Sequence, residues 1–365
     1  MIIGVPKETK IGETRVSLTP LVCRHLVDHG ATVIVECTAG AGSGFSDAEY
    51  QDAGALLEPS AEKIWARADL ILKVKEPLAE EYPLLREGQA LFTYLHLAAN
   101  PALARVLLAK RILGIAYESV ERADGSFPLL KPMSEIAGSL AVQVGAYFLQ
   151  SPQGGAGVLL GGVAGVQPGH VVVIGAGNAG IHSVITAVGF GARVTALDRD
   201  AAKLRLLNDR YGDRVTTLAS TTANLETIIA NADLVVGAVL IPGARAPTVA
   251  TRKMIARMRP GTVVVDIAID QGGCVEGIRP TSHAQPTYID QSVIHYAVPN
   301  MPALVGRTST LALTAVTRRF VEVIAEKGLE RSLAEDRALA NGVNTSAGKI
   351  ISEAVAKALA NAGGF

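Results

Sequence analysis

One stretch of the sequence, HVVVIGAGNAGIHSVITAVGFGARVTALD at residues 170–198, constrains the fold more than any other. It opens with an apolar run typical of a buried strand, and Gly175, Gly177 and Gly180 follow with the spacing GxGxxG. A helical pattern comes next, and a second apolar run ends on Asp198. Strand, glycine turn, helix and strand in this order predict a βαβ unit of a parallel sheet.

Each glycine of this turn has a physical use in binding a dinucleotide. Gly175 allows the tight turn, Gly177 lets the backbone approach a pyrophosphate, and Gly180 lets helix and strand pack closely. The start of the helix directs free N–H groups and a positive dipole end at the phosphates. Asp198 is placed to accept hydrogen bonds from ribose hydroxyls, and its charge repels a 2′-phosphate, so NAD is favoured. Arg199, the next residue, keeps NADP open as the alternative cofactor. The alternative interpretation of Arg199 is a solvated side chain.

Composition limits the class of protein. The 365 residues suffice for two domains, 49% of them are hydrophobic, and 34 basic residues balance 34 acidic ones. This balance predicts neither disorder nor a nucleic-acid partner. The three cysteines are scattered without the spacing of metal ligands, so we expect reduced thiols, no metal site and a cytoplasmic protein. The N-terminus lacks a signal-peptide pattern, and no stretch reads as a membrane span.

Two residues in the first part of the chain follow predicted strands. Lys75 follows an apolar run that ends at Val74, and His96 ends the run that begins at Ala90. Ligands of open α/β sheets bind beyond the carboxyl ends of strands. Lys75 therefore suits a carbonyl or carboxylate ligand, and His96 suits a general acid/base. Position alone favours the alternatives, a solvated lysine and a hydrogen-bonded loop histidine.

Several blocks run in order through nearly the whole chain, namely MIIGVPKE, ETRVSLTP, LKVKEP, LFTYLHLA, KPMSEIAG, GVLLGGVAGV, DIAIDQGGC and RTSTLALT. Together they resemble the L-alanine dehydrogenase family. The resemblance implies a fold of two Rossmann-like parallel-sheet α/β domains with a cleft between them. Residues 1–128 and 308–365 would form a discontinuous substrate domain, and residues 129–307 the NAD-binding domain.

The resemblance also assigns roles to individual residues. Arg15 and Lys75 would bind the carboxylate and the oxo or amino group of pyruvate and L-alanine, and Asn300 would contact substrate or cofactor. His96 would be the acid/base, with Asp270 as a buried carboxylate partner. Arg15 suits its role independently, because a guanidinium grips a carboxylate through two parallel hydrogen bonds. Asp270, before a glycine pair, would otherwise be a turn residue.

The predicted cofactor-binding set extends beyond the glycine turn. Ser134 has two compatible interpretations, an N-cap of a helix that runs to about Leu149 and a hydroxyl near the cofactor phosphates. The full set comprises Ser134, Gly175, Gly177, Asn178, Ala179, Gly180, Asp198, Lys203, Ser220, Val239, Leu240, Ile267, Asp270, Val298 and Met301. The chain departs from the family pattern at Ala156, Ala164, Pro299 and in the turn GAGNAG, which bears on loop rigidity and cofactor affinity.

The C-terminal part has helical patterns at residues 310–327, 333–340 and 349–360, which the family fold returns to the first domain. The resemblance implies NAD-dependent interconversion of L-alanine with pyruvate and ammonia, without membrane or nucleic-acid partners, in a homohexamer. Two alternatives stay open, the nucleotide-binding subunit of a proton-translocating transhydrogenase and a non-catalytic NAD-binding regulator. The set Arg15, Lys75, His96 and Asp270 favours the enzyme, because neither alternative needs a site for an amino acid.

Overall fold

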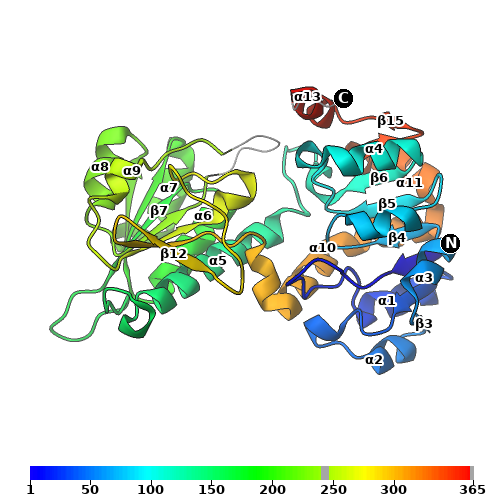
Figure 1. The fold of residues 1–365 in the computed structure, drawn as a ribbon, viewed down its shortest axis with the longest axis horizontal. Coiled ribbons are helices and arrows are strands. Elements are labelled where there is room, and N and C mark those ends of the chain that lie inside the picture. Colours follow the sequence, from blue (N-terminus) through cyan, green and yellow to red (C-terminus); the bar gives the residue numbers. More distant parts are fainter. Residues whose placement is uncertain (240–245, 362–365) are drawn as a thin grey trace. The chain divides into compact units, whose positions relative to one another are not determined.

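The computed structural model describes residues 1–239 and 246–361, and the chain divides into two compact units. The first contains Met1–Met133 and Ala303–Phe365, and the second contains Ser134–Pro302. Each unit is an α/β structure built on its own sheet (Figure 1). Among the described residues, no helix combines the length and apolar character needed to cross a membrane.

The first unit is built on a sheet with the strand order β15-β14-β6-β5-β4-β1-β2-β3. The strands are β1 (Ile2–Val5), β2 (Thr32–Glu36), β3 (Leu56–Glu58), β4 (Leu70–Leu72), β5 (Ala90–Thr93), β6 (Leu113–Ala116), β14 (Val343–Ser346) and β15 (Lys349–Ile350). From β1 to β6 all pairs are parallel, and β14 and β15 add antiparallel pairs at one edge. The strand order reverses between β1 and β4, which makes their carboxyl ends the preferred place for a ligand.

Helices cover this sheet, and their ends follow local capping chemistry. They are α1 (Pro20–Asp28), α2 (Asp47–Asp52), α3 (Ala61–Arg67), α4 (Pro101–Ala109), α10 (Gly306–Lys327), α11 (Leu329–Glu335), α12 (Arg337–Asn341) and α13 (Glu353–Asn361), with α5 (Lys131–Phe148) beginning in this unit. Thr19 caps α1 and Asn100 caps α4 through their side-chain oxygens, and each is followed by a proline, which suits the first turn of a helix. Trp65 and residues of α4 and α13 share one buried apolar cluster.

The C-terminal part differs from its predicted helices in two places. Residues 349–360 do not form one helix, because Lys349 and Ile350 pair with β14 and the helix begins only at Glu353. The hairpin turn uses left-handed backbone at Ala347 (φ 49°) and Gly348 (φ 80°). The helix predicted at residues 333–340 is interrupted at Asp336, whose side chain caps α12. Pairing of β14 with the distant β6 outweighs the local helical pattern.

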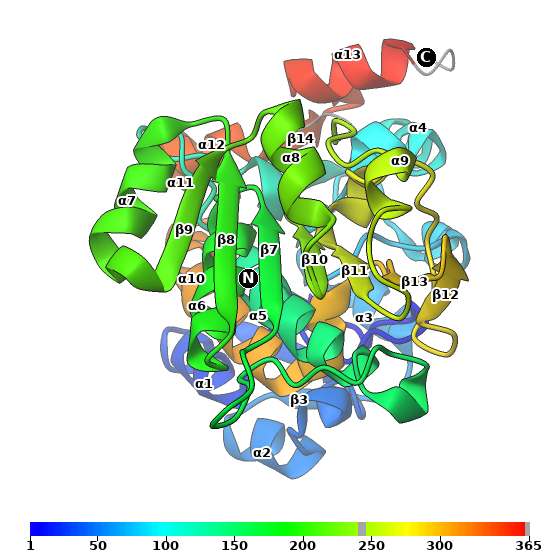
Figure 2. The ribbon, with the colours of Figure 1, turned by 90° about the vertical axis from the view of Figure 1, so that its left-hand side faces the viewer.

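The second unit is built on a sheet with the order β12-β13-β11-β10-β7-β8-β9 (Figure 2). Its strands are β7 (His170–Ile174), β8 (Arg193–Asp198), β9 (Val215–Ala219), β10 (Leu234–Gly237), β11 (Val263–Asp266), β12 (Thr287–Asp290) and β13 (Val293–Tyr296). All pairs are parallel except β12 with β13. The order reverses between β7 and β10, so the glycine turn after β7 lies at the switch point where open sheets bind ligands.

Both faces of this second sheet are covered. On one face, Val172 and Val235 pack with residues of α8 (Thr222–Ile229) and α9 (Arg252–Ile255). On the other, Gly145 of α5 approaches Leu234 and Gly180 of α6 (Asn178–Gly189) approaches Val173. The helix α7 (Ala201–Tyr211) follows β8. Double coverage explains why the strand residues are apolar without alternation.

A buried histidine lies in the sheet of the second unit, at β13. His295 stacks on Tyr288 with the ring centroids 5.1 Å apart and an interplanar angle of 10°. Neither ring nitrogen has a hydrogen-bond partner within residues 1–239 and 246–361. Burial lowers the pKa of His295 below its usual value, although the charge of Asp290 acts in the opposite direction. The folded unit therefore accommodates the neutral ring.

Acidification is expected to destabilise the wild-type protein more than the variant His295→Phe. In the unfolded chain the histidine has a pKa of about 6.5, and in the folded unit its pKa is lower. Its contribution to the free energy of unfolding is therefore complete above the unfolded pKa and is lost as the pH falls through the folded pKa. Urea unfolding of both proteins at several pH values measures the difference, since other titrating groups are common to both. Parallel pH dependences would contradict the assignment.

Candidate active site

The glycine turn after β7 has the backbone geometry that its spacing predicts. Gly175 has φ 101°, and a Cβ there would lie 2.6 Å from the carbonyl oxygen of Ala238. The helix α6 begins at Asn178, directly after Gly177 at the N-cap. A Cβ at Gly180 would lie 1.7 Å from the carbonyl oxygen of Gly175, so only glycine permits this packing. The structural predictions for Gly175 and Gly180 are confirmed.

The start of α6 leaves room for a phosphate group. A Cβ placed on Gly177 would meet no atom of the described chain within 4 Å. The first N–H groups of a helix have no acceptor within the helix and carry the positive end of its dipole, so they bind anions. The turn also lies at the switch point between β7 and β10. The residues present therefore fit the diphosphate of a dinucleotide.

Asp198, at the end of β8, holds the glycine turn. Its Oδ2 accepts the N–H of Ala176 at 2.6 Å, and its Oδ1 accepts the N–H of Asp200 at 2.8 Å. Lys203 on α7 lies with Nζ 3.9 Å from Oδ2. Ser220, one residue beyond β9, donates its N–H to the carbonyl oxygen of Asp198 at 3.0 Å. The structure thus brings these predicted cofactor positions together at one sheet edge.

The remaining predicted cofactor positions also follow strand ends of this sheet. The carboxyl ends of parallel strands meet at one edge. Val239 follows β10, Ile267 follows β11, Val298 and Met301 follow β13, and Asn178 and Ala179 open α6. Val298 and Met301 are buried. Leu240 lies outside the described residues.

The prediction that Ser134 caps a helix is wrong. The helix α5 begins at Lys131, so Ser134 lies inside its first turns instead of before them. Pro132 is well suited to this first turn, because its missing N–H is not needed there. Ser134 is half-buried.

Asp270 lies in a short 3-10 helix, η7 (Ile267–Gln271), directly after β11. Its carboxylate is exposed, so the prediction of a buried carboxylate is wrong. The backbone N–H of Asn300 lies 3.5 Å from Oδ2 of Asp270, and Asn300 has the left-handed φ of 60°. The loop after β13 therefore reaches the loop after β11 within the second unit.

Another aspartate, Asp266, fixes the loop that carries Asp270. It is fully buried and caps η7 by accepting the N–H of Ala268 at 2.9 Å. Its Oδ2 accepts the N–H groups of Cys274 at 2.7 Å and Val275 at 3.1 Å. Burial raises the pKa of Asp266, while these backbone bonds act in the opposite direction. Both ends of the loop thus converge on one carboxylate.

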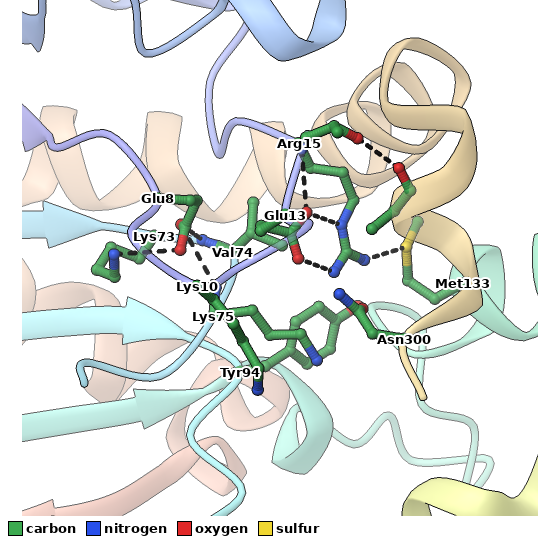
Figure 3. Close-up of polar contacts among 12 residues, drawn as sticks. Glu8, Lys10, Glu13, Arg15, Lys73, Val74, Lys75, Tyr94, Met133 and Asn300 are labelled. Atoms are coloured by element: carbon green, nitrogen blue, oxygen red, sulfur yellow. Dashed lines mark hydrogen bonds and ion pairs between the residues drawn. The ribbon is translucent and has the colours of Figure 1, made fainter. Parts of the chain in front are cut away.

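Lys75 lies at the switch point of the first sheet, beyond β4. It is only 8% exposed, so the alternative of a solvated lysine is wrong. Glu8, from the loop after β1, accepts the N–H of Val74 at 2.6 Å and that of Lys75 at 3.4 Å through the same Oε1 (Figure 3). The two strand ends at the switch point are therefore joined by this carboxylate.

The same carboxylate belongs to a buried cluster of three charges. Lys73 Nζ lies 3.1 Å from Glu8 Oε2 and 2.9 Å from Glu81 Oε1, and all three side chains are at most 5% exposed. Burial disfavours the charge of Lys73, but the two carboxylates outweigh it and raise the pKa of this lysine above its usual value. A buried charge is tolerated only when it is paired in this way.

Arg15 presents a guanidinium to a carboxylate of its own segment. Its Nε donates to Oε1 of Glu13 at 2.7 Å, and its Nη2 donates to Oε2 at 2.6 Å (Figure 3). Its Nη1 lies 3.1 Å from the sulfur of Met133. Both side chains of the ion pair are buried, and Glu13 raises the pKa of Arg15 although burial opposes it. The paired geometry suits a carboxylate, and Glu13 supplies one here.

His96 lies three residues beyond β5 and is exposed. Its ring stacks on that of Tyr94, with centroids 5.8 Å apart and an interplanar angle of 10°. Its backbone is left-handed, with φ 46° and ψ 37°. Its N–H donates to Oε1 of Glu118 at 2.6 Å.

The segments that carry Lys75 and His96 follow the paired strands β4 and β5, and Thr93 Oγ1 donates to the carbonyl oxygen of Lys75 at 3.0 Å. Burial raises the pKa of Glu76, but a hydrogen bond from Lys10 and the charges of Lys75 and protonated His96 bring it below its usual value. The lysine and histidine thus act on one buried carboxylate. The structure places Asp270 and Asn300 in the second unit.

Five carboxylates and a lysine around these residues were not predicted as part of the site. They are Glu8, Glu13, Glu76, Lys73, Glu118 and Asp266. All except Glu13 carry a charge close to a strand end, as for Lys73 directly after β4. Charge at such positions is the one sequence signal that points to them, since Lys and Glu are rarely buried without a partner.

A glycine turn at one switch point and buried cations beside a histidine at another define a nicotinamide-dependent oxidoreductase of the α/β class. Two family models match the chain, "Alanine dehydrogenase/PNT, N-terminal domain" over residues 4–137 and "Alanine dehydrogenase/PNT, C-terminal domain" over residues 141–353. The chain belongs to the alanine dehydrogenase/PNT family.

Curated relatives match over nearly the whole length. Alanine dehydrogenase of Halomonas elongata is 52% identical over 358 residues, covering 98% of this chain and 96% of the relative. Alanine dehydrogenase of Bacillus subtilis is 51% identical over 360 residues, covering 98% and 95%. That of Mycobacterium tuberculosis strain H37Rv is 50% identical over 356 residues, covering 98% and 96%.

Solved structures support the same family. An L-alanine dehydrogenase superposes with a TM-score of 0.96 at 49% identity, covering 99% of both chains. A transhydrogenase from Sinorhizobium meliloti superposes with a TM-score of 0.83 at 27% identity, covering 97% of this chain and 100% of that one. The predictions of family, of a two-domain Rossmann-like fold and of NAD dependence are confirmed.

Proposed function

We propose that the protein catalyses the NAD-dependent oxidative deamination of L-alanine to pyruvate and ammonia, and the reverse reductive amination. The observation that carries this proposal is the match at 52% identity across 98% of the chain to an alanine dehydrogenase. The two switch points support it, because one fits a dinucleotide and the other carries buried cations and a histidine. When bound, the nicotinamide supplies the chemistry of accepting the hydride from the α-carbon.

In this proposal Arg15 and Lys75 bind and orient the substrate. A buried guanidinium and a buried ammonium suit the carboxylate and the oxo or amino group. Arg15 forms a paired contact with Glu13, which holds the guanidinium in place in this proposal. Asn300 contacts substrate or cofactor, as the family resemblance implies.

His96 moves the protons. Deamination needs a group that accepts a proton from water attacking the iminium and returns one to the leaving ammonia. Histidine titrates in the required range, and the position of His96 beyond a strand end near Lys75 supports this role. Asp270 is the carboxylate that favours the cationic iminium, and its support is the family resemblance.

The cofactor set proposed for NAD is the one named from the sequence, with Gly177 and α6 at the diphosphate and Asp198 at the ribose. The proposed substrate domain comprises residues 1–128 and 308–365, and the proposed NAD-binding domain comprises residues 129–307. The compact units Met1–Met133 with Ala303–Phe365 and Ser134–Pro302 support this division. We further propose that the protein is cytoplasmic and a homohexamer. Light scattering of the purified protein tests the number of subunits.

The reaction is tested by following NADH oxidation with pyruvate and ammonium together. Rapid turnover that needs both substrates is expected, with glyoxylate, 2-oxoglutarate and NADPH as comparisons. Absence of turnover while NADH still binds would overturn the proposal. The transhydrogenase subunit or a non-catalytic NAD-binding regulator would then replace it, and the turn GAGNAG would be examined first.

Replacing Asp198 by alanine is expected to weaken NADH binding about ten- to a hundred-fold, because one charge-assisted hydrogen bond is lost. Preference against NADPH should fall as well, because the charge that repels a 2′-phosphate is gone. Asp198→Asn, which keeps one acceptor oxygen, should lie between. The two dissociation constants of each variant measure the effect, and unchanged values for both cofactors would remove Asp198 from the proposed site.

A further inference from the structure

Glu118 holds the chain at His96 from the neighbouring strand. It lies in the 3-10 helix η4 (Tyr117–Ser119), directly after β6, and β6 pairs with β5 (Figure 1). Its Oε1 accepts the N–H of His96 at 2.6 Å, and both of its oxygens lie 3.2 Å from the N–H of Leu95. Hydrogen bonds to a charged acceptor are about twice as strong as those to a neutral one. One side chain thus binds two successive N–H groups.

The backbone at His96 requires such support. Left-handed backbone costs about 1–2 kcal/mol for a residue with a side chain, and it persists where the surroundings determine it. Leu95 beside it is fully buried, so its N–H would lose its acceptor without gaining water. An unsatisfied buried N–H costs about 1–3 kcal/mol. Both penalties would be relieved if the segment moved away from its present conformation.

The imidazole of His96 stacks on an aromatic ring. Tyr94 stacks on it, and the hydroxyl of Tyr94 donates to the carbonyl oxygen of Leu129 at 2.6 Å. The strand end is also tied to the one that carries Lys75, because Thr93 Oγ1 donates to the carbonyl oxygen of Lys75 at 3.0 Å. With these contacts fixed, the position of the imidazole depends on the backbone that Glu118 holds.

We propose that Glu118 is a positioning residue for the reaction, because its carboxylate sets the position of the His96 imidazole by accepting the N–H groups of Leu95 and His96. The inference rests on the proposed function, in which His96 transfers protons. Glu118 acts through His96, so its removal affects the chemical step and leaves the dinucleotide turn of the second unit unchanged.

Three variants test this inference in the full-length protein. Glu118→Ala is expected to lower kcat about 100-fold, the loss typical of a displacement of about 1 Å. Glu118→Gln keeps one acceptor oxygen and should lose less. The KM for NADH should stay within about two-fold in both. Glu121→Ala, which removes a carboxylate from the same segment, should match the wild type. A kcat of Glu118→Ala within about two-fold of wild type would overturn the inference.

A double-mutant cycle separates positioning of His96 from a general structural role. Residual kcat, measured at high enzyme concentration, should be equal in His96→Ala and in the double variant His96→Ala with Glu118→Ala, because the displaced group is already absent. A further loss of about 100-fold in the double variant would overturn the inference. Near-normal activity of His96→Ala would instead overturn the proposed function. If Glu118→Ala does not fold, Glu118→Gln serves in both tests.

Discussion

Replacing His96 by alanine is expected to lower kcat for NADH-dependent amination of pyruvate by about 10³-fold or more, toward the upper end of what general acid–base catalysis contributes. Binding of NADH should be unchanged, because the glycine turn lies in the other unit. The physical reason is that the proposed function assigns proton transfer during deamination to the imidazole of His96, and alanine has no group that can move protons. Steady-state kinetics with a fluorescence titration of NADH measures both effects.

Two further variants make this test specific. Alanine at position 96 would have to adopt φ 46°, so part of any loss could be structural. His96→Asn avoids this, because asparagine tolerates left-handed backbone, and it should lose as much activity as His96→Ala. His283→Ala removes an exposed histidine and should match the wild type. Activity of either position-96 variant within a few-fold of wild type would remove His96 from the catalytic role.

Alanine is expected to lower stability to very different extents at two glycines of the turn after β7. Gly180→Ala would place a Cβ 1.7 Å from the carbonyl oxygen of Gly175, which is backbone and cannot rotate away. We expect it to lower the free energy of unfolding by about 3 kcal/mol or more, at or beyond the upper end of typical overpacking. Gly177→Ala meets no atom within 4 Å in the described part of the chain and should cost about 1 kcal/mol or less.

The same two variants separate folding from cofactor binding. Gly177→Ala should keep its fold and still bind NADH more weakly, because its methyl group occupies the space into which a pyrophosphate must come. Urea unfolding and NADH titration of both variants give the comparison. A stable Gly180→Ala protein, or a Gly177→Ala protein with wild-type affinity for NADH, would contradict this geometry.

Local patterns predicted the elements that bind a dinucleotide. The apolar run before Gly175, the spacing to Gly180 and the acidic end at Asp198 are all short-range features, and the structure confirms the βαβ unit that they form. The caps Thr19 and Asn100 are equally local, since each side chain bonds to an N–H a few residues away.

Features that depend on distant partners were not predictable in the same way. Lys349 and Ile350 form only a two-residue strand, and they pair with β14, whose own partner β6 lies more than two hundred residues earlier. Serine is a residue type that favours the N-cap position, but the helix α5 begins at Lys131, before Ser134 is reached. The prediction that Asp270 is buried rests on the role that the resemblance assigns to it. Such a role does not determine how exposed the side chain is.

The contacts that support the site show the same limit. A pattern can place Lys75 and His96 beyond strand ends, but it does not reveal that Glu8 and Glu118 accept their backbone N–H groups. Those glutamates come from neighbouring strands of the sheet. Their partnership follows from strand order, which only the folded structure establishes.

The buried cluster of Glu8, Lys73 and Glu81 limits how this chain can evolve. Loss of Lys73 leaves two carboxylates without a counter-charge in the interior, at a cost of about 3–5 kcal/mol, whereas exchange of a whole buried ionic cluster for apolar residues is often neutral or stabilising. A path toward an apolar replacement that starts at Lys73 is therefore selected against, although the end point is not. Glu8 also accepts the backbone N–H of Lys75, so a change at Glu8 also affects the lysine that we propose binds the substrate.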